Sequence, residues 1–309
     1  MSRKSNIEWT DHTWNPIVGC STDHILTQPL RWRKPKRIFV NSMGDLFHED
    51  VPDEWIDKVF AVMALAPQHT FQVLTKRADR MREYITDAKM QRRIDVAMVN
   101  LLADAPIARL PTPITDANYK WPLPQVWLGI SAERQQEADE RIPHLLQTPA
   151  AVRFVSAEPL LGPIDLTSVW YSEHRSLNAL TGWKGFDDSG ARMHCSALNW
   201  IIVGGEGGPR ARPMHPDWAR SLRDQCETAG AAFFFKQWGE WIDFHAAPID
   251  ARLKTDIDAV PYGEWHDDTG FVASCLCGAG HGSVIRVGKK AAGRLLDGRE
   301  HNGMPQVRA

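Results

Sequence analysis

The chain has 309 residues, and its 36 Lys and Arg against 38 Asp and Glu give a formal net charge of −2 at pH 7. This balance excludes a globally basic surface, so any nucleic-acid binding would have to be local. No apolar run is long enough for a signal peptide core or a membrane-spanning helix. Five cysteines without regular spacing fit a reducing compartment, and we therefore expect a cytoplasmic protein.

A short apolar run followed by a polar turn and an amphipathic segment recurs along the chain. The runs have the length and β-branched content of buried strands. Strands are predicted at 37–40, 71–74, 126–130, 152–155, 200–203 and 232–235. Helices are predicted at 52–66, from 79 through 102, from just after 133 to about 147, and at 213–229 with Gly230 as the C-cap. This alternation predicts an α/β fold, an incomplete (β/α) barrel.

Polar and ionisable residues follow each predicted strand. In a parallel barrel the carboxyl ends of the strands meet at one rim, where such folds place their chemistry. Any turn between a strand and a helix must be polar to meet water, but six such turns with acids, amides and lysines favour a shared site. The candidate rim residues are Asn41, Ser42, Asp45, Thr75, Lys76, Glu133, Ser156, Glu158, Gly204, Gly205, Glu206 and Lys236. We expect Lys76 and Lys236 to pair with carboxylates there.

Two further segments have the composition of ligand-binding elements. The glycine-rich stretch 204–208 before a helix is a weak candidate for a phosphate cradle, since it lacks a P-loop lysine. The densest basic run is a candidate nucleic-acid contact in which Trp32 stacks on a base, or else a solvated lead-in to a strand. Its members are Arg31, Trp32, Arg33, Lys34, Lys36 and Arg37.

The segments 165–199 and 243–283 break the strand–helix rhythm, and we interpret them as insertions over the rim or at its side. The domain prediction is a barrel at 1–242 and a C-terminal extension at 243–309. Within the extension, Cys275, Cys277 and His281 have a spacing compatible with a zinc site, with His266 or the pair His194 and Cys195 as further ligands. The alternative is a reduced surface loop. Cys226 fits the apolar face of its helix and is predicted to be packed.

The stretch 7–20, Ile-Glu-Trp-Thr-Asp-His-Thr-Trp-Asn-Pro-Ile-Val-Gly-Cys, closely resembles the start of the phage gp-thirty-seven/gp-sixty-eight family, a domain of unknown function that looks like radical-SAM enzymes. The resemblance continues in order through 31–35, 38–48, 72–77, 155–162, 203–206, 235–240 and 287–294. It implies a radical-SAM (TIM-like) barrel, a [4Fe-4S] cluster and S-adenosylmethionine. The substrate is not implied, although nucleic acid is one candidate.

The chain departs from that family at the cluster motif. In the family, the cysteine equivalent to Cys20 is soon followed by a C-x-x-C pair, and the three thiolates are thought to hold the cluster. Here Cys20 is followed by Ser-Thr-Asp-His-Ile-Leu and no such pair. One thiolate cannot hold a cubane cluster, although Cys275 and Cys277 could in principle supply two more. We therefore expect a chain without the cluster and its activity. The competing hypothesis is a non-catalytic module that binds a ligand or nucleic acid.

The same departure removes a crossover helix between the first two strands. Parallel strands need cover on their outer face, so an exposed apolar strip beside Ile38 and Val40, with self-association through it, is predicted. The alternative is a lid made from Leu26, Leu30 and Trp32.

Overall fold

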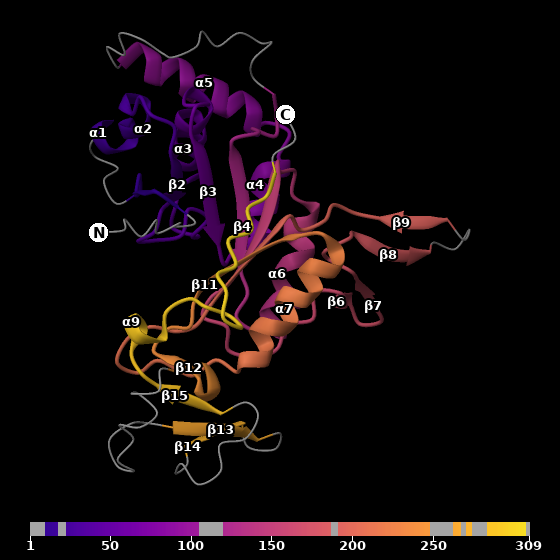
Figure 1. Ribbon diagram of the computed structural model, residues 1–309. Helices are drawn as coiled ribbons and strands as arrows, with labels where there is room; N and C mark the ends of the chain where they lie inside the picture. Colours follow the sequence, from indigo (N-terminus) through magenta and orange to yellow (C-terminus); the bar gives the residue numbers. More distant parts are fainter. Residues whose placement is uncertain are drawn as a thin grey trace.

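The computed structural model describes residues 10–17, 23–104, 120–186, 191–247, 262–266, 270–273 and 283–306. Its main feature is a parallel sheet of seven strands in the order β1-β2-β3-β4-β5-β10-β11, curled into a half-barrel (Figure 1). The strands are β1 (His12–Trp14), β2 (Arg37–Val40), β3 (Thr70–Thr75), β4 (Val126–Ser131), β5 (Val152–Ala157), β10 (Trp200–Gly204) and β11 (Ala232–Gln237). All six predicted strands are in this sheet, which confirms the α/β class.

Helices cover the outer face of the sheet. They are α3 (Asp53–Leu65), α4 (Ala78–Thr86), α5 (Met90–Asp104), α6 (Gln135–Gln147) and α7 (Pro216–Ala229). One apolar cluster joins both layers, with Val73, Leu128 and Val203 from strands and Phe60 and Leu222 from helices. Each such side chain contributes about 1.5–3 kcal/mol when it is fully buried, so this layer holds the helices to the half-barrel.

The helix that follows β10 and its glycine-rich turn is α7, and both its ends have clear causes. Pro216 occupies the first helical turn, and the His215 side chain accepts a hydrogen bond from the backbone N–H of Asp217. Gly230 ends the helix in the left-handed region at φ 73°, which confirms the predicted C-cap. The predicted start at 213 was three residues early, because the proline sets the first turn.

The prediction of one continuous helix from 79 through 102 is wrong. The chain forms α4 and α5 with a break between Thr86 and Met90. Asp87 has extended backbone angles, and its carboxylate accepts a hydrogen bond from the backbone N–H of Lys89 at 3.0 Å. A short acidic side chain that bonds nearby backbone in this way competes with continuation of a helix.

The prediction of an uncovered apolar strip is also wrong. The crossover from β1 to β2 contains two one-turn helices, α1 (Asp23–Leu26) and α2 (Gln28–Arg31). Leu30 is buried, and Leu26 and Trp32 pack against the same core. Ile38 and Val40 are at most 1% exposed, so the lid alternative is confirmed and the premise for self-association through this side is gone.

The inner face of the half-barrel carries a second apolar cluster, made of Trp127, Val152, Phe154, Trp200, Ile202 and Phe234. The rings of Trp127 and Trp200 meet edge to face at 5.8 Å. A Cβ at position 129 would lie 2.5 Å from the Phe154 ring, so the glycine there is required by this packing. The lower part of the inner face is therefore a packed core.

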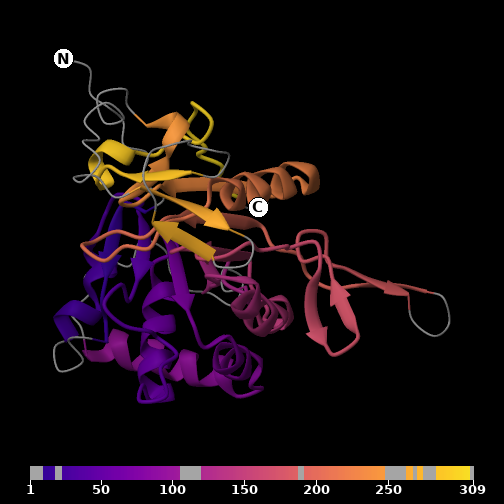
Figure 2. The same cartoon turned by 90° about the horizontal axis from the view of Figure 1, so that it is seen from below.

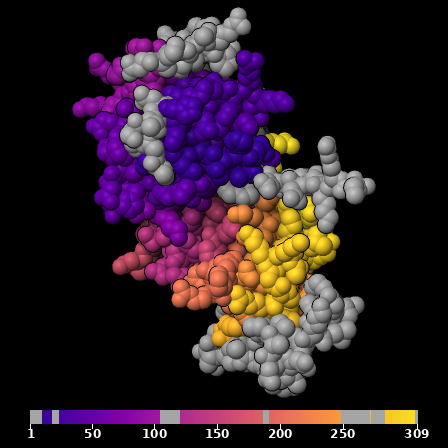
Figure 3. All heavy atoms as spheres, turned by 90° about the vertical axis from the view of Figure 1, so that its left-hand side faces the viewer, coloured from indigo at the N-terminus to yellow at the C-terminus, as the bar shows by residue number. Residues whose placement is uncertain are grey.

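The chain returns to the sheet near its C-terminus. Residues 301–303 run antiparallel along β11, with backbone hydrogen bonds from Phe235 to His301 at 3.0 Å and from Gly303 to Phe233 at 2.9 Å. The Trp200 indole donates to the Gly303 carbonyl at 2.8 Å. Figure 1 shows this yellow segment beside β11, and Figure 3 shows C-terminal residues below the indigo N-terminal ones.

The remaining strands lie outside the half-barrel. Two hairpins, β6 (Val169–Ser172) with β7 (Arg175–Leu177) and β8 (Trp183–Phe186) with β9 (Arg192–His194), project sideways (Figures 1 and 2). A four-stranded antiparallel sheet has the order β12-β15-β13-β14. Its strands are β12 (Trp241–Asp243), β13 (Tyr262–His266), β14 (Gly270–Ala273) and β15 (Val284–Arg286). One 3-10 turn, η1 (Phe244–Ala246), and one short helix, α9 (Lys289–Ala292), complete the described elements. The domain boundary at 242 stays a prediction.

Candidate functional site

The predicted rim residues lie at or just beyond the carboxyl ends of six parallel strands. We call the turns after β2, β3, β4, β5, β10 and β11 the rim. Side chains alternate between the two faces of a strand, so the register places Ser131, Ser156 and Ile202 in one row on the inner face. The rows below this one are apolar except for Gln72, which pairs with Trp127 in register, and polar side chains stand above them.

Asp45 joins the turns after β2 and β3. Its Oδ1 accepts hydrogen bonds from Thr75 Oγ1 at 2.7 Å and from the backbone N–H of Phe47 at 2.9 Å. Its Oδ2 accepts from the backbone N–H of Lys76 at 3.0 Å and from Arg77 Nη1 at 3.1 Å. Four donors use the capacity of this carboxylate, so Asp45 positions the turn that carries Lys76.

Lys76 and Glu133 form the first charged pair of the rim, with Lys76 Nζ 2.5 Å from Glu133 Oε1. Arg141 Nη1 holds the other carboxylate oxygen at 3.2 Å. Glu133 is 7% exposed, whereas the Lys76 side chain is 57% exposed. The ammonium therefore faces solvent while a buried carboxylate fixes its position.

Lys236 and Glu158 form the second pair at 2.7 Å, and Gln237 Nε2 donates to the same carboxylate at 3.0 Å. A Cβ on Gly204 would lie 3.1 Å from the carboxyl carbon of Glu158, so a glycine leaves room for this acid. The predicted pairing of both lysines with carboxylates is thus present in the structure.

Glu206 is tied to the following loop and not to the two lysines. Arg212 donates to it through Nε at 2.8 Å and Nη2 at 2.9 Å, and these hydrogen bonds lower the pKa of Glu206. Two N–H groups of the glycine-rich stretch are also used, Gly205 by a carbonyl of β11 and Gly208 by Glu240 Oε1. The stretch is therefore built mainly to fold the loop against β11. A Cβ on Gly205 would lie only 1.8 Å from a backbone oxygen.

Asn41 and Trp127 carry buried polar groups that lack protein partners. Asn41 is 3% exposed, adopts a positive φ of 62°, and neither its amide oxygen nor its amide nitrogen has a hydrogen-bond partner in the described ranges. Trp127, on the inner face, is 5% exposed, and its indole Nε1 also has no hydrogen-bond partner among the described residues. Beside Asn41, Ser42 Oγ donates to Asn15 Oδ1 at 3.1 Å.

The predicted metal ligands Cys20, Cys275, Cys277 and His281 lie outside the described residues. Of the described cysteines, Cys226 is fully buried in α7, where burial raises the pKa of its thiol to about 12, and Cys195 is half-buried. Among the residues that the structure describes, no group of three or more His, Cys, Asp or Glu could hold a metal ion. The described donors therefore do not fit an iron–sulfur cluster or a zinc ion.

The basic run is only partly open to a partner. Trp32 packs edge to face against His12 at 4.7 Å, and Lys36 Nζ lies 5.3 Å from the centre of its ring. Arg37 pairs with Asp11 at 2.9 Å. Arg33 and Lys34 are exposed. Nucleic-acid binding through this run stays a prediction. The Trp32 ring, which was predicted to stack on a base, packs against His12 and Lys36.

Three partners in the rim were not predicted from the sequence: Arg141, Gln237 and Arg212. Arg141 lies on α6, eight residues beyond the acid it holds, and nothing in its spacing identifies it. Gln237 follows Lys236 directly, and Arg212 precedes a helix within six residues of Glu206. Proximity in sequence was the only signal for these two.

Within the described ranges no helix is long and apolar enough to span a membrane. No curated protein and no solved structure matches this chain. A family model described as "Protein of unknown function (DUF5131)" matches residues 21–305, which is most of the chain and includes every strand of the half-barrel except β1. The chain therefore belongs to the DUF5131 family.

Proposed function

We propose that this protein is a ligand-binding half-barrel whose ligand is an organic anion rich in hydrogen-bond acceptors. The ligand lies on the inner face at the rim, against Asn41 and between Lys76 and Lys236. The observation that carries this proposal is the buried, unpartnered amide of Asn41.

The Asn41 side chain is costly in the protein by itself. Leaving a buried polar group without a partner costs about 1–3 kcal/mol, and a non-glycine residue at positive φ adds about 1 kcal/mol. A glycine would avoid both costs at this position. A ligand that pairs with the amide gives a physical reason for asparagine there.

The two ammonium groups of the rim support an anion. Lys76 and Lys236 carry three N–H donors each. Each ammonium is held in place by a carboxylate, at 2.5 Å and 2.7 Å. Charges fixed in this way need little reorganisation when a ligand binds.

S-adenosylmethionine, which the family resemblance implies, shares part of this chemistry. Its carboxylate suits the exposed ammonium of Lys76, and its purine and ribose offer acceptors to Asn41. Its sulfonium and ammonium groups leave it with a net positive charge, so ATP is the anionic probe of the two. The proposal concerns binding by these residues and assigns no reaction to them.

Titration calorimetry with S-adenosylmethionine and with ATP tests the proposal. We expect the wild-type chain to bind at least one probe and Asn41→Gly to bind it at least about tenfold more weakly, a loss of about 1.4 kcal/mol. The same variant should melt at the same or a higher temperature, because it removes a buried unpartnered amide. Met43→Ala, two positions along the same turn and 76% exposed, is the control and should bind normally. Absence of binding by both probes, or equal affinity of Asn41→Gly, would contradict the proposal.

Radical chemistry is the second candidate, and the parallel half-barrel favours it because the resemblance implies that arrangement. It requires a cluster, and the donors among the described residues do not fit one. We propose that the chain carries no cluster. Iron and sulfide analysis of protein purified without oxygen should give far less than one cluster per chain. Stoichiometric iron that disappears in Cys20→Ala would instead support the radical enzyme.

A further inference from the structure

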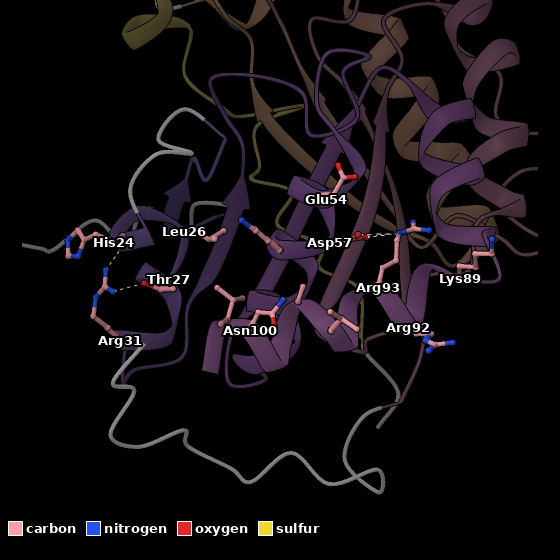
Figure 4. Close-up of a pocket in the computed structure, with 14 residues that line it drawn as sticks. His24, Leu26, Thr27, Arg31, Glu54, Asp57, Lys89, Arg92, Arg93 and Asn100 are labelled. Atoms are coloured by element: carbon pink, nitrogen blue, oxygen red, sulfur yellow. Dashed lines mark hydrogen bonds and ion pairs between the residues drawn. The ribbon is translucent and has the colours of Figure 1, made fainter. Parts of the chain in front are cut away.

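A cavity lies outside the half-barrel, between the turn that joins α1 to α2 and the helices α3 and α5 (Figure 4). Its volume is about 900 Å³, within the range of small-molecule sites. We call it the groove. It is lined by His24, Leu26, Thr27, Arg31, Glu54, Asp57, Lys58, Lys89, Arg92, Arg93, Val96, Ala97, Asn100 and Leu101.

The middle of the groove is apolar. Val96, Ala97 and Leu101 follow one another along one stripe of α5, and Leu26 faces them from the end of α1. Val96 is 54% exposed, which is unusual for a valine on a helix that packs against α3. An aliphatic chain in the groove would remove this surface from water, at about 25 cal/mol per Å² of apolar area.

The ends of the groove are basic. Figure 4 shows Arg31 on the side of α2, and Lys89, Arg92 and Arg93 at the start of α5. Arg93 is engaged by Asp57 at 3.1 Å and also by Asp87.

The other cations of the groove have no acidic partner among the described residues. Lys58, Lys89 and Arg92 form no ion pair with a carboxylate in that part of the chain. Among the described residues, Arg31 bonds neutral oxygens, those of Thr27 Oγ1 at 2.9 Å and of the His24 carbonyl at 2.5 Å. The charge that is left uncompensated in the groove is therefore mainly positive.

We propose that the groove binds an elongated anionic amphiphile, an aliphatic chain that ends in a carboxylate or a phosphate. The chain lies along the apolar stripe of α5, and the anionic end lies beside Lys89 and Arg92. The pairing of an apolar middle with unpaired cations is the chemistry that selects this class. This site is separate from the rim and does not depend on the ligand proposed there.

Binding of dodecanoate and dodecyl phosphate to the full chain, measured by calorimetry below the concentration at which they form micelles, tests the proposal. Dodecyltrimethylammonium and monolaurin, which share the chain length, should bind at least about tenfold more weakly than the better anion. Comparison of the two anions shows which head group the site prefers.

Two variants of α5 separate the groove from the helix surface in general. Val96→Glu places a carboxylate on the apolar stripe and should weaken binding about tenfold or more. Val99→Glu is the matched control, since Val99 is 64% exposed on the same helix and does not line the groove. It should change affinity less than about twofold. Arg92→Glu should weaken anion binding about fivefold and leave monolaurin unaffected.

Circular dichroism melts of each variant establish that the fold is retained. Equal losses in the two valine variants, or binding of the cationic amphiphile as tight as that of the anions, would overturn the proposal. So would the absence of binding by both anions. The rim variant Asn41→Gly should bind dodecanoate normally, which keeps failure at the two sites distinguishable.

Discussion

The rim and the groove both present cations, but in different settings. At the rim, Lys76 and Lys236 are each held by a carboxylate that is largely shielded from solvent. In the groove, Lys58, Lys89 and Arg92 form no ion pair within the described ranges and stand beside apolar side chains. At the rim, the positions of the charges are therefore fixed before a ligand binds. In the groove, most of the favourable binding free energy would come from burying apolar surface. The predictions below test this contrast.

The largest effect is expected at Asp57, where the groove has a fixed ion pair like those of the rim. Asp57 is 4% exposed, accepts from Tyr84 at 2.6 Å and pairs with Arg93, which joins α3 to α4 and α5. Asp57→Ala should lower the free energy of unfolding by about 3 kcal/mol, because it leaves the Arg93 charge without this partner. Urea denaturation of the variant and the wild type measures this change in the free energy of unfolding.

Tyr84→Phe serves as the control for that change. It removes one hydrogen bond and keeps the ion pair, and should cost about 1 kcal/mol. If Asp57→Ala costs no more than Tyr84→Phe, the pair does not support the contact between the helices.

The next effect is expected at the rim. Glu133→Ala should lower the free energy of unfolding by about 2 kcal/mol, because Arg141, whose side chain is 15% exposed, loses its carboxylate. Lys76→Ala should cost less than about 1 kcal/mol, since its side chain is 57% exposed. Chemical denaturation of both variants compares them. Equal costs would mean that the buried acid does not organise the rim.

Salt should separate the two sites by a smaller factor. Raising the salt concentration from about 0.05 M to about 0.5 M should weaken the binding of dodecyl phosphate about fivefold, because exposed charges are screened. Binding of an anion at the rim should weaken only about twofold, because each ammonium there is already paired with a carboxylate and the net charge that salt can screen is smaller. Calorimetry at both salt concentrations gives the change in affinity at each site. A larger loss of affinity at the rim than in the groove would contradict the contrast between paired and unpaired cations.

The smallest effect is expected at Glu206, a rim acid that pairs with Arg212. The hydrogen bonds from Arg212 lower its pKa below the ordinary 4.5. A lowered pKa of an acid contributes stability that is complete above its unfolded pKa and is lost as the pH falls through the folded pKa. Glu206→Gln should therefore cost about 0.5 kcal/mol at pH 7. The difference from wild type should shrink as the pH falls below 4.5 and vanish once the pH is below the lowered pKa, in urea denaturation across that range. A constant difference would show that the charge is not its cause.

The sheet was predictable from sequence because each strand is a short apolar run with a polar end. The helix break at Asp87 was missed, although a short acidic residue two positions before Lys89 is a local signal of a helix start. The sequence predicted that Lys76 and Lys236 would pair with carboxylates, but not with which ones. Lys76 is 57 residues from Glu133 and Lys236 is 78 residues from Glu158, and only the register of the strands brings these residues together.

The groove could not be predicted in the same way. Its sides come from α1, α2, α3 and α5. The sequence pattern predicted one long helix, whereas the break before α5 places Lys89 in the lining of the groove. The unpartnered amide of Asn41 was likewise invisible, because the sequence marks a polar residue after a strand but not the absence of its partners.

The backbone segment 301–303 has a consequence for the edges of the sheet. Without it, β11 would present a row of unpaired N–H and C=O groups, to which a strand of another molecule can add. Its hydrogen bonds to Phe233 and Phe235 occupy that row. The opposite edge, β1, is only three residues long and offers little to a foreign strand. Both edges are thus protected from the addition of strands that leads to fibres. The β11 edge is covered by an antiparallel segment, and the β1 edge is too short to pair with a foreign strand.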